Sequence, residues 1–418
     1  MERRSAGNFD WLIIILFLAL VSIGWMNIYS ASLDPEAVSG SFDFSNLYTK
    51  QFVWIVLSFV LIIFILFLDA KFFERFASVI YIGSLLSLLG LYVFGKEISG
   101  ATSWYDLGGF SIQPSEFAKA ATALALAKYL SDIQTDVASF QHQLKAFLII
   151  ALPAIFIIPQ PDPGSAIVYA AFFFPLYREG LSGVYLIVGI SLVALFVTTL
   201  AFGPFYVCAG MVLLTVILFL LKRKKRSGKS LFIILPLVCI GFVFSVNYIF
   251  QNVFEQRHRD RFNVVLGKQV DAKDIGYNTR QSEIAIGSGG WTGRGFLKGT
   301  QTTGNFVPEQ HTDYIFSTVG EEWGFLGSTF VIFLFVALMI RIIFLAEKQK
   351  NQFSRIYGYS VAGILFIHFL INIGMVTGVF PTVGIPLPFF SYGGSGLWGF
   401  TILLFIFVRL DGNRSNEW

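Results

Sequence analysis

The chain has 418 residues, of which 55% are hydrophobic and only 13% are charged, and its formal net charge is +4. Soluble domains carry about 25% charged residues, so this composition excludes an ordinary water-soluble domain. The small net charge does not favour nucleic-acid binding. Repeated apolar runs of about twenty residues predict transmembrane helices, because a helix must cross about 30 Å of hydrocarbon at about 1.5 Å per residue.

The apolar runs predict twelve membrane spans, and thus an all-α polytopic membrane protein with one integral domain over residues 1–418. Cys208 and Cys239 lie inside these runs, so we expect core residues and neither a disulfide nor a metal site. In chain order the predicted spans are 11–31, 52–68, 75–95, 113–131, 145–159, 164–177, 182–202, 205–221, 231–250, 317–346, 356–379 and 388–409.

Basic residues in the short loops predict the orientation of these spans, because short cytoplasmic loops are enriched in Lys and Arg. Lys71, Lys145 and the run from Lys222 to Arg226 fall on one side of the membrane when the N-terminus is cytoplasmic. Twelve spans then place both termini in the cytoplasm and residues 251–313 on the opposite face.

Residues 251–313 form the only long polar segment of the chain. The segment mixes charges of both signs with the glycine-rich runs 287–295 and 299–305. Glycine allows a backbone to approach a ligand closely. Apolar residues such as Phe296 and Phe306 are interleaved with the charges, which favours a folded loop. Since loops of this length are generally functional or disordered, we predict a functional extracytoplasmic loop.

Glu116 and Lys119 place opposite charges inside the predicted span 113–131. They are three residues apart, so they share one face of a helix and can pair. Charges within apolar spans are costly and generally face a cavity. Two interpretations remain open, namely a structural ion pair within the membrane and a pair that lines a polar cavity for an anionic lipid headgroup.

Asp162 lies in the proline-rich turn 159–165, just before an apolar run. Three prolines in five residues cannot continue a helix. The carboxylate therefore fits the N-cap of the following helix in a tight reversal. The alternative is that Asp162 lies near a lipid substrate and orients a cationic partner such as Lys119.

A third polar cluster contains Glu309, His311 and Asp313, and Glu321 and Glu322 follow shortly afterwards. If these side chains gather at one mouth, their oxygen ligands suit Mg²⁺ or Mn²⁺. Their spacing matches no zinc pattern. We expect no permanent metal held by the protein alone.

Residues 386–396 combine prolines and glycines with Ser391. This composition predicts a re-entrant turn or a broken helix, which a membrane tolerates only where protein or water satisfies the freed backbone groups. The sequence contains no GxxxxGK[ST] loop for nucleotide phosphates, which argues against an ATP-driven pump.

Five motifs carry a resemblance to a known family: QPSEFAK, QPDPGSA, GYNTRQSEIAIGSGGWTGRGFLKGTQ, PEQHTDYIFSTVGEEWG and PFFSYGGSG. In this order they resemble the SEDS family, whose members include RodA, FtsW and SpoVE. The combination of PEQHTDYIF with GTQ is most similar to the RodA branch. The resemblance covers nearly the whole chain. It implies a peptidoglycan glycosyltransferase that polymerises lipid II by inverting transfer, on the outer face of the bacterial cytoplasmic membrane, during cell elongation.

The resemblance also implies partners. They are lipid II, the glycan carried on undecaprenyl diphosphate, a class B penicillin-binding protein with transpeptidase activity and other proteins of the elongation machinery, whereas nucleic acid is not expected. No organic cofactor is implied, and a divalent cation (Mg or Mn) would be bound with the substrate diphosphate. Two alternatives remain open: a lipid II flippase, and a scaffold for the penicillin-binding protein.

In the family an essential aspartate precedes a glycine–tyrosine pair, which is Gly276-Tyr277 here. Asp271, five residues before Gly276, matches the usual placement and is the candidate general base. Asp274 is the competitor, because VDAKDIGYN lacks the family's usual proline after the aspartate. The residues that we predict to contact substrate are Glu116, Lys119, Asp162, Arg257, Arg261, Arg280, Gln281, Ser282, Glu309, His311, Asp313 and Ser391.

The chain departs from the family pattern in two ways. Ser103 and Ser111 stand where the family commonly has arginines, so phosphate contacts must come from elsewhere, and the candidates are Arg257, Arg261, Arg280 and Lys119. The family usually has ten spans, whereas residues 181–250 are long enough for three spans where one is typical. We therefore expect an inserted helical hairpin over residues 182–221.

Overall fold

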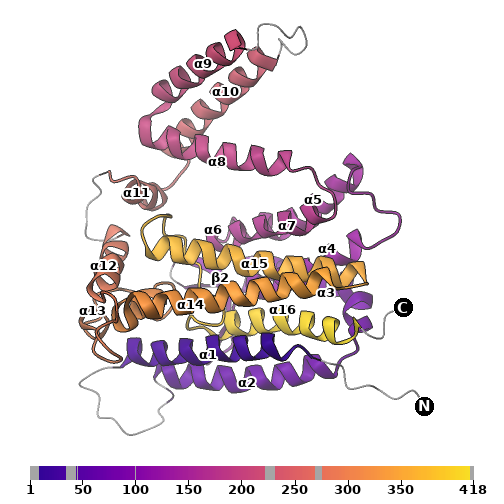
Figure 1. Ribbon diagram of the computed structural model, residues 1–418, viewed down its shortest axis with the longest axis vertical. Coiled ribbons are helices and arrows are strands. Elements are labelled where there is room, and N and C mark those ends of the chain that lie inside the picture. The colour runs from indigo at the N-terminus through magenta and orange to yellow at the C-terminus, as the bar shows by residue number, and fades with distance from the viewer. Residues whose placement is uncertain are drawn as a thin grey trace. The chain divides into compact units, whose positions relative to one another are not determined.

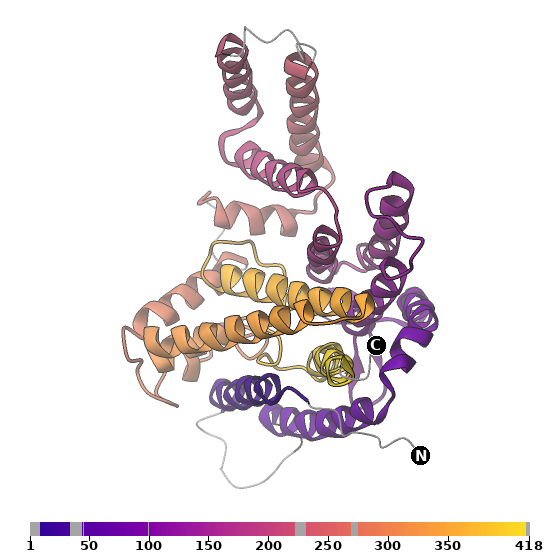
Figure 2. The same ribbon diagram turned by 45° about the vertical axis from the view of Figure 1, so that its right-hand side comes forward.

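The computed structural model describes residues 9–33, 44, 46–98, 100–221, 231–268 and 275–414. The chain divides into two compact units. The main unit comprises Met1–Leu181 and Asn278–Trp418, and the second unit comprises Ser182–Tyr277. Figures 1 and 2 show the ribbon in two views.

The first half of the main unit is built from long helices, three of which have a recognisable N-terminal signal. Asp10 accepts a hydrogen bond from the amide of Ile13, and Asp69 accepts one from the amide of Lys71, so each carboxylate caps a free helix N-terminus. Pro114 occupies the first turn of its helix, where its missing N–H costs nothing. These helices are α1 (Trp11–Ser32), α2 (Leu47–Phe67), α3 (Ala70–Phe94), α4 (Pro114–Leu130) and α5 (Phe140–Ile157).

The next predicted span, 164–177, is a broken helix and not a single one. It consists of α6 (Pro163–Ile167), the 3₁₀ segment η1 (Val168–Phe172) and α7 (Phe173–Arg178). Most of η1 is buried, and the segment packs against α15, so protein surrounds the irregular backbone. That burial meets the condition under which a membrane protein tolerates a broken helix.

The C-terminal half of the main unit holds three helices at its centre, α14 (Ile315–Glu347), α15 (Gln352–Val376) and α16 (Gly394–Gly412). α15 packs against α14 and α4, while α14 also packs against α1, and α16 packs against α2 and α4 (Figure 1). α14 is kinked at Gly324, where φ is 65° and ψ is −161°. Only glycine adopts this backbone conformation readily.

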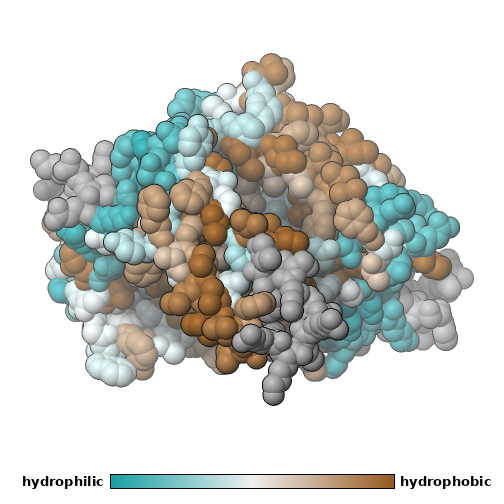
Figure 3. All heavy atoms as spheres, turned by 90° about the horizontal axis from the view of Figure 1, so that it is seen from above, coloured by the Kyte–Doolittle hydropathy of each residue, from teal (hydrophilic) through white to brown (hydrophobic). Residues whose placement is uncertain are grey.

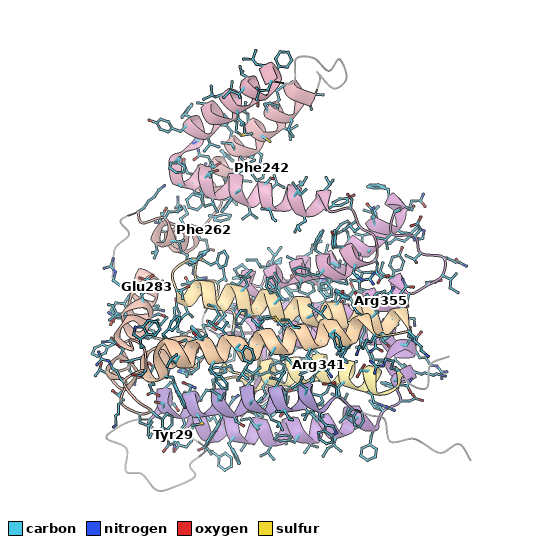
Figure 4. The ribbon with its side chains drawn as sticks, viewed as in Figure 1. Tyr29, Phe242, Phe262, Glu283, Arg341 and Arg355 are labelled. Carbon is cyan, nitrogen blue, oxygen red and sulfur yellow. The ribbon has the colours of Figure 1, made fainter. Side chains whose placement is uncertain are left out.

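Ion pairs join the ends of these helices. Arg355 at the start of α15 donates to Glu179 at 2.9 Å, and Arg178 at the end of α7 donates to Glu347 at 2.6 Å. Arg341 on α14 pairs with Asp10, the cap of α1. Figure 4 labels Arg341 and Arg355 on their helices. The pairs are partly exposed, so each one contributes little stability by itself, and their effect is to fix which helix ends meet.

A small antiparallel sheet lies between α3 and α4 in the chain, and the all-α prediction missed it. Its strands are β1 (Lys96–Ile98), β2 (Ala101–Asp106) and β3 (Ser111–Ile112), in the order β1-β2-β3. Lys96 pairs with Trp104, and Tyr105 pairs with Ile112. β1 and β3 are too short for a period-two pattern, which needs about four residues or more, and the six residues of β2, ATSWYD, do not alternate between apolar and polar.

The second unit contains the predicted hairpin. α8 (Val184–Phe202) and α9 (Pro204–Leu221) meet at Gly203, whose φ of 86° makes the turn, and α10 (Leu231–Asn252) packs against both. The amphipathic α11 (Gln256–Val265) follows and packs Phe262 (labelled in Figure 4) against Phe196 and Phe250. The run from Lys222 to Arg226 lies outside the described residues.

Ten helices among the described residues are long and apolar enough to cross a membrane. Twelve spans were predicted, and the difference comes from α4, which has 17 residues, and from the broken helix of residues 163–178. Apolar side chains cover much of the surface seen in Figure 3, with hydrophilic residues gathered at its two sides. The predicted helical membrane fold is confirmed.

Cys208 and Cys239 are free thiols, in α9 and α10.

The polar segment 251–313 is largely helical where it is described. After α11 it contains α12 (Ile275–Ser288) and α13 (Thr300–Thr303). The last predicted span, 388–409, begins later than expected, at Gly394, because residues 386–393 form an irregular segment. The irregular backbone that the prolines and glycines predicted is present there.

We expect Gly324→Ala to destabilise the main unit. A Cβ at this position would lie 2.3 Å from the backbone nitrogen of Gly293, and φ there is unfavourable for alanine. Strained backbone of this kind costs about 1–3 kcal/mol before the clash is counted. The measurement is the melting temperature of the purified protein in detergent. Gly189→Ala is the matched control, because a Cβ there meets nothing within 4 Å. Equal melting temperatures for the two variants would contradict the kink.

Candidate functional site

A buried polar cluster lies within the membrane-spanning part of the main unit. The Lys119 ammonium nitrogen lies 2.8 Å from Oε1 of Glu116 and 2.9 Å from Nε2 of His368. All three side chains are at most 4% exposed. The predicted pairing of Glu116 with Lys119 is confirmed. Its partner His368, on α15, was not predicted, although a histidine within the apolar run 356–379 is a signal that could have found it.

Two further contacts complete this cluster, which we call the Lys119 site. The Lys119 ammonium lies 4.8 Å from the centre of the Phe400 ring, a cation–π distance. Oε2 of Glu116 has no hydrogen-bond partner among the described residues, although it is buried. A buried carboxylate oxygen without a partner is costly, so it is a position for a ligand group or a water molecule.

Asp162 lies at the start of the broken helix and caps it. Oδ1 accepts a hydrogen bond from the amide of Ser165 at 3.0 Å, and Oδ2 accepts one from Nε2 of Gln113 at 2.9 Å. The prediction of an N-cap is confirmed. The alternative, in which Asp162 orients Lys119, is not what the structure shows, because the Lys119 ammonium contacts Glu116 and His368 instead.

Residues 309–314 and residues 384–393 meet near the C-terminal end of α15. We call these two stretches the mouth segments. Ser391 donates a hydrogen bond to the carbonyl of Thr312 at 2.6 Å, and the amide of Tyr392 donates to the carbonyl of His311 at 2.9 Å. Three predicted site residues, His311, Asp313 and Ser391, are thereby brought together on these segments.

Asn372 on α15 fastens both mouth segments. Its side-chain nitrogen donates to the carbonyl of Asp313 at 2.8 Å and to the carbonyl of Ile385 at 2.7 Å. No motif in the sequence pointed to Asn372. An amide inside an apolar run was again the available signal, because irregular backbone in a membrane protein needs such donors.

His311 is half-buried and packs against the ring of Tyr392. Burial lowers the pKa of His311, and the nearby Glu309 carboxylate opposes this shift only in part. The imidazole is therefore mainly neutral near pH 7. Glu309 itself is exposed and accepts a hydrogen bond from the Thr312 hydroxyl at 2.9 Å.

Glu321 and Glu322 anchor a loop and do not join the mouth. Glu321 caps α13 by accepting hydrogen bonds from the amides of Gln301 at 2.8 Å and Thr302 at 2.9 Å. Glu322 accepts a hydrogen bond from the hydroxyl of Ser30. The hypothesis that one of them gathers with Glu309 and His311 is therefore wrong, because each carboxylate is engaged elsewhere. Within the described ranges, no three His, Cys, Asp or Glu side chains form a group that could hold a metal ion.

Three residues of α12 were predicted to contact substrate, namely Arg280, Gln281 and Ser282, and they differ in burial. Ser282 is buried and donates a hydrogen bond to the carbonyl of Val376 at 2.8 Å, so it holds α12 against the end of α15. Arg280 is exposed, and Gln281 is half-buried. Glu283, labelled in Figure 4, lies against Gly378, where an added Cβ would come within 2.0 Å of its carboxylate.

The remaining predicted residues belong to residues 251–274. Arg261 is half-buried in α11, within the second unit. The side chain of Arg257 and the aspartates Asp271 and Asp274 lie outside the described residues. The assignment of Asp271 as general base therefore stays a prediction.

The chain matches the profile of a family described as "Cell cycle protein" (FtsW, RodA, SpoVE), over residues 10–226 and over residues 184–416. It is 32% identical to the peptidoglycan glycosyltransferase RodA of Treponema pallidum strain Nichols, across 99% of this chain and 100% of that protein. It is 30% identical to the peptidoglycan glycosyltransferase MrdB of Escherichia coli K12, across 93% of this chain and 90% of that protein.

Solved structures are similar over the same length. One comes from a study of the structural coordination of polymerization and crosslinking by a peptidoglycan synthase complex. It has a TM-score of 0.73 at 26% identity and covers 98% of this chain and 99% of that chain. The RodA structure of Thermus thermophilus has a TM-score of 0.65 at 25% identity, with the same coverage. These similarities agree with the multi-pass helical membrane fold described above.

We expect the charges of the Lys119 site to depend on each other. Glu116→Gln or Lys119→Met leaves one buried charge without its partner, which commonly costs about 3–5 kcal/mol. Each single variant should lower the yield of folded protein or its activity, and the reversed pair, Glu116→Lys with Lys119→Glu, should recover part of the loss. Yield is measured by fluorescence-detected size-exclusion chromatography, and activity by incorporation of labelled lipid II.

The exposed ion pair between Lys96 and Asp106 provides a matched control. Lys96→Met should change the free energy of unfolding by less than about 1 kcal/mol, because water already screens this pair. If Lys96→Met and Lys119→Met were equally harmless, the Lys119 site would be neither energetically buried nor functional.

Proposed function

Because the chain belongs to the FtsW, RodA and SpoVE family of cell cycle proteins, we propose that it is a peptidoglycan glycosyltransferase that polymerises lipid II into glycan strands. The observation that carries this proposal is the similarity to named peptidoglycan glycosyltransferases along almost the full length of both chains. The Lys119 site supports it as well, because charged residues within a membrane generally serve a polar ligand or a pathway.

The proposed reaction transfers the growing glycan from its polyprenyl diphosphate to the 4-hydroxyl of the GlcNAc of an incoming lipid II. The new bond joins the anomeric carbon of the donor to the acceptor oxygen. The bond between the anomeric carbon and the diphosphate oxygen breaks with inversion, and the polyprenyl diphosphate leaves with the electron pair. The proton of the acceptor hydroxyl must be removed as its oxygen attacks, and a positioned carboxylate can do this.

Asp271 is the proposed general base of this reaction. The leaving diphosphate accumulates negative charge, which nearby cations stabilise. Arg257, Arg261 and Arg280 are the proposed contacts to its phosphates. A divalent cation, Mg²⁺ or Mn²⁺, would arrive with the diphosphate as part of the substrate complex.

Lys119 has a geometry that suits a role beside an anionic headgroup. An ammonium group has three N–H donors. Glu116 and His368 accept two of them, so one donor remains for a ligand. The unpartnered Oε2 of Glu116 offers an acceptor in the same place. These two groups would suit a ligand that carries both a phosphate oxygen and a hydroxyl.

The proposed partner is a class B penicillin-binding protein that crosslinks the strands as they are made, together with other proteins of the elongation machinery. The similar structure of a peptidoglycan synthase complex, which coordinates polymerization and crosslinking, supports this proposal. The proposed location is the bacterial cytoplasmic membrane, with both termini in the cytoplasm and Asp271 on the outer face. The loop charges described in the sequence support that orientation.

Asp271→Ala should abolish polymerisation and leave the protein folded, because loss of a positioned acid or base lowers a rate by about 100- to 10,000-fold. Purified protein with its penicillin-binding protein is incubated with labelled lipid II, and glycan chain length is read by gel electrophoresis. Asp274→Ala is the matched control and should keep chain formation. A reversal of the two results would assign the base to Asp274. Absence of polymerisation by the wild type, together with transport of labelled lipid II across the membrane of proteoliposomes that contain it, would support the flippase instead.

Thiol labelling tests the proposed orientation of the chain in the membrane. After removal of Cys208 and Cys239, single cysteines replace Ile133, which is fully exposed between α4 and α5, and Lys298, which is exposed before α13. A membrane-impermeant maleimide applied to intact spheroplasts should label position 298 and spare position 133, since lipid II is polymerised on the outer face. Labelling of both positions after lysis shows that each is reactive. Labelling of 133 in intact cells would reject the orientation and the role of Asp271 with it.

A further inference from the structure

We infer that His368 is a positioning residue that fixes the Lys119 ammonium for glycosyl transfer, an inference that rests on the proposed function. His368 is 1% exposed and lies on α15, 249 residues from Lys119 in the chain. Nothing in the motifs of the sequence joined these two residues. Their contact at 2.9 Å links α15 to α4 at the centre of the main unit.

The contacts of His368 define where its proton lies. A lysine ammonium group can only donate, so Nε2 of His368 must accept the hydrogen bond from Lys119. The other nitrogen, Nδ1, lies 3.2 Å from the carbonyl oxygen of Pro386. A carbonyl can only accept, so Nδ1 carries the hydrogen. The geometry thus assigns a neutral imidazole with its proton on Nδ1.

These contacts fix the conformation of the long Lys119 side chain. Lysine has four rotatable side-chain bonds, and ordering them costs about 2 kcal/mol. Glu116 holds the ammonium group from its own helix, and His368 holds it from α15. The Phe400 ring of α16 lies under the ammonium and meets the His368 ring edge-on, with centroids 4.7 Å apart. Three helices therefore hold one ammonium group, with one donor left for substrate.

His368 also connects Lys119 to the mouth segments. Its Nδ1–H bonds to Pro386, and Asn372, one helical turn further along α15, bonds to Asp313 and Ile385. Residues four apart lie on the same face of a helix. One face of α15 thus holds both mouth segments and the lysine, so a shift of the 384–393 segment would move the imidazole and the ammonium together.

The competing interpretation is that His368 serves only to tether Pro386 and pack α15. Two substitutions separate the interpretations, because each keeps one of the two contacts. In the variant His368→Gln, the amide oxygen of the new side chain occupies a place near that of Nε2 and can accept from Lys119, but the contact with Pro386 is lost. In His368→Asn, the shorter amide occupies a place near that of Nδ1 and can donate to Pro386, but it does not reach Lys119.

The experiment measures polymerisation of labelled lipid II by the full chain with its penicillin-binding protein, together with the melting temperature of each variant. His368→Asn should lower kcat by about 100-fold, the effect of misplacing a reacting group by about 1 Å. His368→Gln should keep most of kcat, although it loses the tether. The melting temperatures of the two variants should not follow the order of their kcat values. Higher activity in His368→Asn than in His368→Gln, or equal activity in both, would reject the positioning role.

A spectroscopic measurement on the unmodified chain does not depend on the variants or on activity. The chain has four histidines, so selective ¹⁵N-histidine labelling gives a small set of signals. One imidazole, assigned by its loss in His368→Asn or in His368→Gln, should show the neutral tautomer with hydrogen on Nδ1. Lys119→Met should shift its Nε2 signal. An imidazolium, or hydrogen on Nε2, would overturn the inference. An inactive wild type with the expected tautomer would instead reject the proposed function alone.

Discussion

A positive charge buried in a membrane protein must be met by other groups, and Lys119 imposes this requirement on the whole main unit. Transfer of an ammonium group into the interior costs several kcal/mol unless its hydrogen bonds are satisfied. The groups that satisfy it come from α4, α15 and α16, through Glu116, His368 and Phe400. A slide or rotation of α15 or α16 against α4 would break the contacts of Lys119 with His368 and Phe400, although Glu116, on α4 itself, would stay beside it. The buried charge therefore favours one register of these three helices.

The irregular backbone around the helices also needs hydrogen-bond partners for its buried polar groups. Segments without helical hydrogen bonds need donors and acceptors from side chains where water is scarce. Asn372 and Ser391 supply them for the mouth segments, while Glu321 supplies them for α13. Gln310 belongs to this set as well, because its side-chain nitrogen donates to the carbonyl of Ala31 at 2.8 Å and to that of Thr302 at 3.0 Å. Many polar residues in the sequence motifs thus hold the loops in place.

Features that depend on local spacing could be predicted from the sequence. Features that depend on contacts between residues far apart in the chain could not. The spans followed from apolar runs, and the Glu116–Lys119 pair followed from its three-residue separation. His368 and Asn372 act through partners on other elements, which no spacing shows. The sequence around Glu321 and Glu322 suggests a metal site because it is rich in acidic residues, and it gives no sign of the amides and the hydroxyl that bind these carboxylates. The small sheet gave no periodic signal, because β1 and β3 have three and two residues and β2 does not alternate between apolar and polar residues.

The departures from the family pattern can now be related to the charges of the site. Ser103 is buried in β2, and Ser111 uses its carbonyl to accept a hydrogen bond from Ser395, so neither brings a cation to the start of α4. Among the described residues, Lys119 is the only lysine or arginine that is buried. Arg257, Arg261 and Arg280 remain the proposed source of further positive charge for the diphosphate. In the proposed reaction, residues 251–313 would then supply positive charge as well as the base.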